Sequence, residues 1–125
     1  MQVGDSKPRR ILIVEDEMLI ALNLEDMLVQ LGHTVVATAT RITEALKLAA
    51  ESNINLAILD INLSGSPSFP VADMLRNRGI PFLFATGYGS QGLTESYRKE
   101  IVLGKPYGLR ELQNAVGTVL NVRAT

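Results

Sequence analysis

The sequence has no cysteine and no tryptophan, only one histidine, and just 5% aromatic residues. The lack of cysteine excludes a disulfide framework, and one histidine, His33, cannot form a histidine metal cluster or a Cys–His catalytic pair. No apolar run approaches the roughly 18 residues of a membrane span, and the first ten residues are too polar for a signal peptide. These absences favour a cytoplasmic protein that does not enter a membrane.

An excess of charge of either sign is also missing. The chain carries 12 Lys and Arg against 13 Asp and Glu, a net charge of −1, and its basic residues form no stripe. We therefore expect no direct binding to nucleic acid, which depends on neutralising phosphates. The length of 125 residues, 46% of them hydrophobic, is typical of one globular domain. We expect a disordered segment over residues 1–8 and a single domain over residues 9–123.

Short apolar runs alternate with segments of helical periodicity along the chain. Five runs are typical of strands that are buried on both faces: residues 11–14, 33–39, 56–59, 80–86 and 101–103. A helix is predicted after each run, and glycines at 87, 89 and 92 predict that the fourth helix is short or disordered. The alternation predicts an α/β fold, a doubly wound five-stranded parallel sheet with helices on both faces.

Polar residues follow four of these runs, at the ends that parallel strands bring to one edge of a sheet. In chain order they are Glu15 with Asp16, then Asp60, Thr86 and Lys105. Clustered carboxylates repel one another unless cations neutralise them, and Mg²⁺ prefers oxygen ligands. The sequence therefore predicts a Mg²⁺ site for phosphoryl transfer at this edge.

Four segments around these residues resemble the motifs of the response-regulator receiver domain: Ile11–Glu17, Leu56–Asn62, Phe82–Tyr88 and Val102–Tyr107. The resemblance covers nearly the whole chain and implies a flavodoxin-like fold with strand order 2-1-3-4-5. It also implies a stand-alone receiver of two-component or phosphorelay signalling, which takes a phosphoryl group from a sensor histidine kinase or a histidine phosphotransfer protein. Such a receiver is a signalling phosphoacceptor rather than an ordinary enzyme, although it catalyses its own phosphorylation and slow dephosphorylation.

The resemblance implies a role for each residue of the acidic cluster. Asp60 would be the phosphoacceptor. Asp16, Asp60 and the backbone carbonyl of Asn62 would bind Mg²⁺ directly, and Glu15 would act through water.

Other residues would bind the phosphoryl group and transmit the signal. Thr86 and Lys105 would contact the phosphoryl group, and the Lys105–Pro106 peptide bond would be cis. Residues 81–89 are similar to the signature of the FATGUY receivers, and Val102 stands where most receivers carry a switch aromatic.

Tyr88 is the candidate to replace that aromatic residue. The glycines beside it, with few large apolar residues to anchor the segment, predict that residues 87–97 are mobile. We expect this segment to become ordered when Thr86 engages the phosphoryl group.

The helix after the first strand carries a second apolar stripe, formed by Met18, Leu22 and Val29. By resemblance, this stripe and Tyr107 would dock the histidine kinase or phosphotransfer protein. The alternative is that the stripe only broadens the surface that faces the core. We expect the unphosphorylated protein to be monomeric.

Three other functions stay open at this point. A degenerate receiver would be a docking module independent of phosphorylation, although the complete set of site residues argues against it. A small Mg²⁺ phosphatase would need Asp-x-Asp after the third run, where Asn62 holds the second position. Nucleotide binding would use the glycines at 87, 89 and 92, but that pattern belongs after the first strand.

Overall fold

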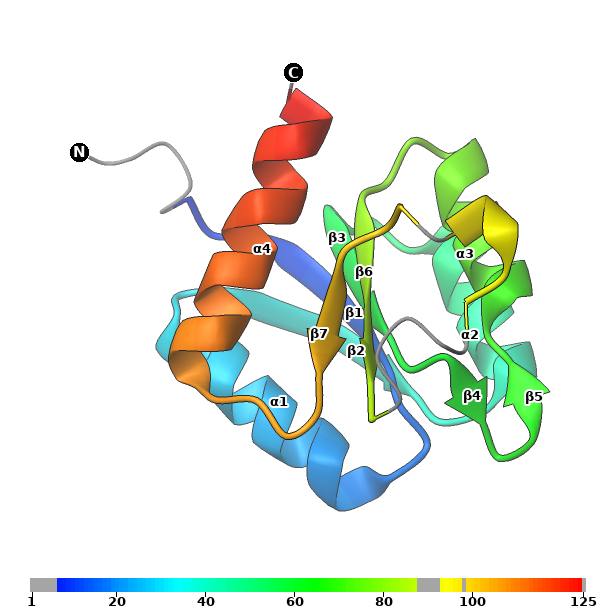
Figure 1. The fold of residues 1–125 in the computed structure, drawn as a ribbon, viewed down its shortest axis with the longest axis horizontal. Coiled ribbons are helices and arrows are strands. Elements are labelled where there is room, and N and C mark those ends of the chain that lie inside the picture. The colour runs from blue at the N-terminus through cyan, green and yellow to red at the C-terminus, as the bar shows by residue number, and fades with distance from the viewer. Residues whose placement is uncertain (1–6, 88–92, 98, 125) are drawn as a thin grey trace.

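The computed structural model of the chain describes residues 7–87, 93–97 and 99–124. Most of the segment expected to be disordered, residues 1–8, lies outside the described residues. One sheet of five parallel strands has the order β2-β1-β3-β6-β7 (Figure 1). The strands are β1 (Arg10–Val14), β2 (Thr34–Ala39), β3 (Leu56–Leu59), β6 (Phe82–Thr86) and β7 (Val102–Gly104). Because a separate hairpin takes the labels β4 and β5, this is the predicted order 2-1-3-4-5, and the predicted fold class is confirmed.

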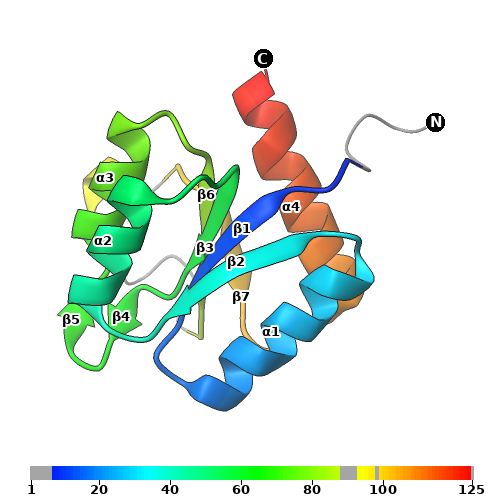
Figure 2. The same cartoon turned by 180° about the vertical axis from the view of Figure 1, so that it is seen from behind.

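Helices cover both faces of the sheet. They are α1 (Met18–Gln30), α2 (Ile42–Glu51), α3 (Phe69–Asn77) and α4 (Leu109–Ala124). Helices α1 and α4 pack on one face and α2 and α3 on the other, as the two opposite views show (Figures 1 and 2). None of the helices in the described ranges has the length and apolar character of a membrane span. With both faces covered, the ends of the strands are left for polar chemistry.

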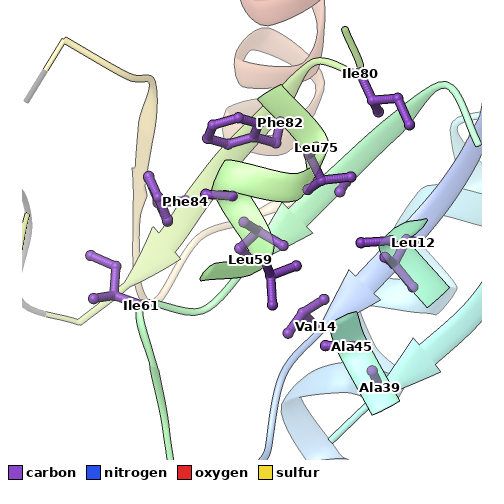
Figure 3. Packing of buried hydrophobic residues seen from close by; sticks show 14 of the residues in the cluster. Leu12, Val14, Ala39, Ala45, Leu59, Ile61, Leu75, Ile80, Phe82 and Phe84 are labelled. Atoms are coloured by element: carbon purple, nitrogen blue, oxygen red, sulfur yellow. The ribbon is translucent and has the colours of Figure 1, made fainter. Parts of the chain in front are cut away.

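The central strands are buried on both faces, as their near-continuous apolar sequences predict. In β1, Leu12 and Val14 belong to the core under α2 and α3, whereas Ile11 and Ile13 belong to the core under α1 and α4. Figure 3 shows the first of these clusters, in which Phe84 of β6 is among the largest fully buried side chains. Burying each large apolar side chain contributes roughly 1.5–3 kcal/mol. The two cores therefore hold the strand ends in a fixed arrangement.

Two glycines end helices and start the turns toward the next strands. Gly32 after α1 and Gly79 after α3 have φ values of 94° and 72°. The following amides, those of His33 and Ile80, donate to carbonyls five residues earlier in the chain. This C-terminal motif requires a left-handed residue and so favours glycine. The predicted helix stop at Gly32 is confirmed.

The connection from β3 to α3 contains an antiparallel hairpin that the sequence analysis does not predict. Its strands are β4 (Asn62–Leu63) and β5 (Ser66–Pro67). The two residues between them, Ser64 and Gly65, have φ values of 52° and 92°, as in a type I′ turn. Leu63 is buried, so the hairpin is anchored to the core.

In the described part of the segment where a short fourth helix is predicted, the structure has one 3₁₀ turn, η3 (Glu95–Tyr97). Residues 88–92, with Tyr88 and most of the segment expected to be mobile, lie outside the described residues. Few large apolar residues are present in this segment, as noted from the sequence, but two of them, Leu93 and Tyr97, are buried and anchor its described part. The ring of Tyr97 extends from the 3₁₀ turn to side chains of α3 and β6.

The ring of Tyr97 belongs to an aromatic cluster, called here the Tyr97 cluster, of Phe69, Phe82, Phe84 and Tyr97. Tyr97 stacks on Phe69 of α3 with ring centroids 5.2 Å apart. The guanidinium of Arg76 lies 4.3 Å from the centroid of the same ring. The hydroxyl of Tyr97 donates to the carboxylate of Asp73. These contacts tie η3 to α3 and to the strand that carries Thr86.

We expect Tyr97→Ala to lower the free energy of unfolding by about 3–5 kcal/mol, because it removes a buried ring from this cluster. Tyr97→Phe should cost about 1 kcal/mol, since it loses only the hydroxyl that donates to Asp73. Urea denaturation measures both changes. Ser96→Ala, at the exposed neighbouring position, is the control and should stay within about 0.5 kcal/mol of the wild type. A loss below about 1 kcal/mol for Tyr97→Ala would contradict the anchoring role.

Candidate functional site

The register of the strands brings the predicted polar residues to one edge of the sheet. The last residues of β1 and β3 are paired, so Glu15 and Asp60 follow side by side. At the other end of the group, the amide of Lys105 donates to the carbonyl of Thr86 at 2.9 Å. The edge thus gathers the ends of four strands from distant parts of the chain.

Lys105 is the positive charge of this group. Its Nζ lies 2.7 Å from Glu15 Oε1 and 3.5 Å from Asp60 Oδ2. The side chains of Lys105 and Glu15 are 16% and 4% exposed, so water and salt screen the pair only weakly. The second oxygen of Glu15 accepts a hydrogen bond from the amide of Glu17 at 3.1 Å. Glu15 is therefore engaged at both oxygens, whereas Lys105 holds Asp60 less closely.

The pKa values of Glu15, Asp60 and Lys105 follow from their burial and from the charges around them. Burial raises the pKa of Asp60 above its usual value, the charge of Lys105 opposes the rise, and the charge of Asp16 adds to it. Burial also raises the pKa of Glu15, against the hydrogen bond from Lys105. Burial acts to lower the pKa of Lys105, but its bond to Glu15 and the nearby carboxylate charges outweigh burial and raise it. One lysine does not neutralise three carboxylates, so the site favours a further cation.

Asp16 is held from the β4–β5 hairpin. The amide and the Oγ of Ser64 both donate to Asp16 Oδ2, at 2.9 and 2.8 Å. Burial acts to raise the pKa of Asp16, but the bonds from Ser64 outweigh it and lower the pKa. Asp16 is thus kept ionised beside two carboxylates whose pKa values are raised.

The oxygen atoms of this site fit a hard divalent cation. Carboxylate oxygens of Glu15, Asp16 and Asp60 lie within 4.8 Å of one another. Asp16 and Asp60 border an open pocket of about 630 Å³ that Asn62 and Thr86 also line. An all-oxygen donor set suits Mg²⁺ better than zinc or copper. The residues present are therefore compatible with the Mg²⁺ site predicted from the sequence.

Of the other residues implied by the resemblance, Thr86 and Lys105 line this pocket. Thr86 is buried at the end of β6, and the Lys105–Pro106 peptide bond is cis. Tyr88 lies outside the described residues. Tyr107 follows directly after Pro106, and burial, together with the charges of Glu15 and Asp60, raises its pKa to about 12.

The predicted second stripe of α1 is exposed. Met18, Leu22 and Val29, called here the α1 apolar face, are 55%, 50% and 56% exposed, so the alternative that they face the core is wrong. Leu19, at 83%, adds to this face and was not expected from the periodicity. Leu19 and Tyr107 also line one groove of about 420 Å³ beside Lys105. The groove and the acidic pocket therefore share Lys105, which follows β7.

A comparison with known families agrees with this geometry. The family model for the response regulator receiver domain matches residues 11–117. The chain belongs to the response regulator receiver domain family. Receiver domains of this family act in two-component signalling. The acidic group of this receiver domain is compatible with the Mg²⁺ that such domains bind.

Curated relatives extend this finding. The phyllosphere-induced regulator PhyR of Methylorubrum extorquens is 40% identical to the receiver domain over 101 residues, which are 78% of this chain and 38% of PhyR. The transcriptional regulatory protein PdtaR of Mycobacterium tuberculosis is 31% identical over 113 residues, 87% of this chain and 55% of PdtaR. The chain therefore spans about half or less of these relatives.

Two solved structures are similar over almost their whole length. SdrG from Sphingomonas melonis Fr1 is 42% identical, with a TM-score of 0.82, and the match covers 90% of this chain and 97% of SdrG. The receiver domain of PhyR from Erythrobacter litoralis is 30% identical, with a TM-score of 0.82. The match covers 98% of this chain and 97% of the PhyR receiver domain. The fold of the receiver domain is thus shared with both.

Ser64 is the residue of this site that sequence reasoning missed. The Ser64-Gly65 pair is a turn signal, which could have indicated the hairpin. Its partner Asp16 lies 48 positions away in the chain, and no pattern relates the two. Only the folded chain brings the turn of the hairpin beside Asp16, in the loop after β1.

We expect Asp60→Asn to raise the free energy of unfolding of the metal-free protein at pH 7 by on the order of 1 kcal/mol. A carboxyl whose folded pKa is raised above its usual value stabilises the native state below that value and loses this contribution as the pH rises through the folded pKa. Asparagine does not ionise, so the variant lacks this loss, while Lys105 keeps its bond to Glu15.

Urea denaturation between pH 4 and pH 7, at low salt and without divalent cations, measures the effect. Asp26→Asn replaces an exposed carboxylate of α1 outside the cluster and is the matched control. Equal pH dependence of the wild type and Asp60→Asn would contradict a raised pKa of Asp60 in the folded protein.

Proposed function

We propose that this receiver domain accepts a phosphoryl group on Asp60 from a sensor histidine kinase or a histidine phosphotransfer protein, in a Mg²⁺-dependent reaction. The observation that carries the proposal is the place of Asp60 at the end of β3, in an open pocket that Asp16, Thr86 and Lys105 also line. Asp60 is held by Lys105 at 3.5 Å, whereas Glu15 is bound at 2.7 Å. Asp60 is thus the carboxylate of the pair that is available to react.

The proposed reaction is an in-line displacement at phosphorus. A carboxylate oxygen of Asp60 attacks the phosphorus of a phosphohistidine, and the P–O bond forms as the P–N bond breaks. The electron pair of the broken bond leaves with the imidazole, and Asp60 becomes an acyl phosphate. Because the transition state is loose and its charge lies on the equatorial oxygens, positioning and electrostatics supply most of the catalysis.

The neighbouring residues would each stabilise part of the negative charge on the phosphoryl group. Asp16, Asp60 and the backbone carbonyl of Asn62 would hold Mg²⁺, which supplies positive charge to the phosphoryl oxygens when it is bound. Lys105 offsets charge on another phosphoryl oxygen. Glu15 keeps Lys105 in place and would reach the cation through water.

The signal would start at Thr86. Its hydroxyl would donate a hydrogen bond to the new phosphoryl group and draw the loop after β6 inward, and this movement would be the switch. Tyr88 remains our candidate for the aromatic residue that follows this movement, because valine occupies position 102.

The wider role that we propose is signalling through protein contacts, with residues 9–123 as the functional unit. PhyR of Bartonella quintana, 27% identical to this chain, is described as an anti-anti-sigma factor, which supports an output of this kind. The domain would be a phosphoacceptor that catalyses its own phosphorylation and slow dephosphorylation, not an enzyme with a separate substrate. We also propose that it acts in the cytoplasm as a monomer before phosphorylation.

Incubation with acetyl phosphate and Mg²⁺ should add one acid-labile phosphoryl group to the wild type and none to Asp60→Asn. Intact mass measures the addition, and Asp26→Asn on the exposed side of α1 should be labelled like the wild type. Equal labelling of Asp60→Asn would show that another residue is the phosphoacceptor. A wild type that takes no label would contradict the receiver chemistry and favour the phosphorylation-independent docking module.

The α1 apolar face is the proposed docking surface for the phosphodonor protein. Exposed apolar side chains that gather on one helix, beside the groove lined by Tyr107, are typical of a protein-binding surface. Leu22→Glu should slow phosphotransfer from a phosphorylated histidine kinase about tenfold or more, because it places a charge in that contact. Labelling by acetyl phosphate should not change, since the pocket is untouched.

Thr43→Glu, an exposed position on α2 at the opposite face of the sheet, is the matched control. Comparable slowing by Thr43→Glu would mean that charge alone, rather than the α1 apolar face, controls the transfer.

A further inference from the structure

Two hydrogen bonds from the hairpin turn end on a single oxygen of Asp16. The amide and the hydroxyl of Ser64 both donate to Oδ2, at 2.9 and 2.8 Å. A carboxylate oxygen accepts about two such bonds through its lone pairs. With Oδ2 occupied in this way, Oδ1 is the oxygen through which Asp16 would bind a cation.

The hairpin holds Ser64 in this position by its own constraints. Ser64 and Gly65 adopt the two positive φ values of a tight turn. The amide of Gly65 donates to Asn62 Oδ1 at 3.0 Å, which closes the turn, and Leu63 is only 3% exposed, which seats β4 on the core. The turn therefore presents both donors of Ser64 to Asp16 from a fixed direction.

The two common hard cations use carboxylates differently. Mg²⁺ requires a compact, near-octahedral shell and usually binds through one or two carboxylates together with waters. Ca²⁺ accepts about 6–8 oxygen ligands and often takes both oxygens of one carboxylate. A carboxylate with one oxygen occupied by hydrogen bonds suits the first cation better than the second.

We propose that Ser64 is a positioning residue that restricts Asp16 to one-oxygen ligation and thereby favours Mg²⁺ over Ca²⁺ at this site. The inference rests on the proposed function, in which Asp16 binds the cation. Hydrogen bonds from outside the ligand shell orient metal ligands, and their loss typically changes metal affinity about 10–100-fold.

Ser64→Gly is the variant that tests this role. It removes the hydroxyl, keeps the backbone amide and is compatible with a positive φ, so the turn is retained. Ser66→Gly is the matched control, because Ser66 pairs with Leu63 in the same hairpin and is not among the described residues that line the pocket. It adds the same backbone freedom without removing a bond to Asp16.

The measurement is the dissociation constant of each cation, titrated separately into the full chain and followed by backbone amide shifts in NMR. Ser64→Gly should weaken Mg²⁺ binding about tenfold and Ca²⁺ binding by no more than about threefold, so the preference for Mg²⁺ falls. Ser66→Gly should leave both constants within about twofold of the wild type. Equal weakening of both cations, unchanged binding of both, or a like effect of Ser66→Gly would overturn the inference.

A second readout needs no metal. The amide proton of Ser64 should resonate downfield in the metal-free wild type and move upfield in Asp16→Ala, because it loses a charged acceptor. An unchanged Ser64 resonance in Asp16→Ala would overturn the contact on which the inference depends.

Different outcomes would overturn the proposed function and the role of Ser64. A wild type that shows no response to Mg²⁺ and no labelling by acetyl phosphate overturns the proposed function and the inference together. A wild type that binds Mg²⁺ and is labelled, with an unchanged cation preference in Ser64→Gly, overturns the role of Ser64 alone.

Discussion

The ion pair between Lys105 and Glu15 is the interaction on which the functional edge of this domain depends. The two residues are 90 positions apart in the chain and follow strands β7 and β1, which are separated in the sheet by β3 and β6. Their bond therefore spans the ends of both intervening strands. It fixes the lysine within reach of Asp60, and it leaves Asp16 and Asp60 with more negative charge than the protein itself neutralises.

The rest of the fold maintains that arrangement. Side chains on both faces of the central strands are buried, so the strand ends cannot shift without disturbing one of two cores. The Tyr97 cluster adds a link from β6 to α3 and η3 on one side of the sheet. Phe84, two residues before Thr86 in β6, is thus linked to Phe69 of α3 and to Tyr97 of η3.

Most of the fold and the main site residues could be predicted from the sequence, because they depend on local patterns. Continuous apolar runs indicate buried parallel strands, and parallel strands bring their final residues to one edge. The places of Asp60 and Lys105 in the site could be predicted from this rule together with the family resemblance. Ser64 and Tyr97 could not be predicted in the same way. Their partners lie in other elements. Their contacts depend on how a hairpin and a 3₁₀ turn pack against the folded core.

The β4–β5 hairpin is a surface connection whose length is not free to vary. Most loops tolerate insertions, because the cost of closing a longer loop rises slowly. Here two turn residues join paired strands of two residues each, and the same turn reaches Asp16. One inserted residue would shift the pairing and turn buried Leu63 toward solvent, because strand side chains alternate between faces. Among homologous receivers that keep a serine in contact with this aspartate, the stretch from the phosphoacceptor to α3 should therefore have a constant length, even where the neighbouring loops differ.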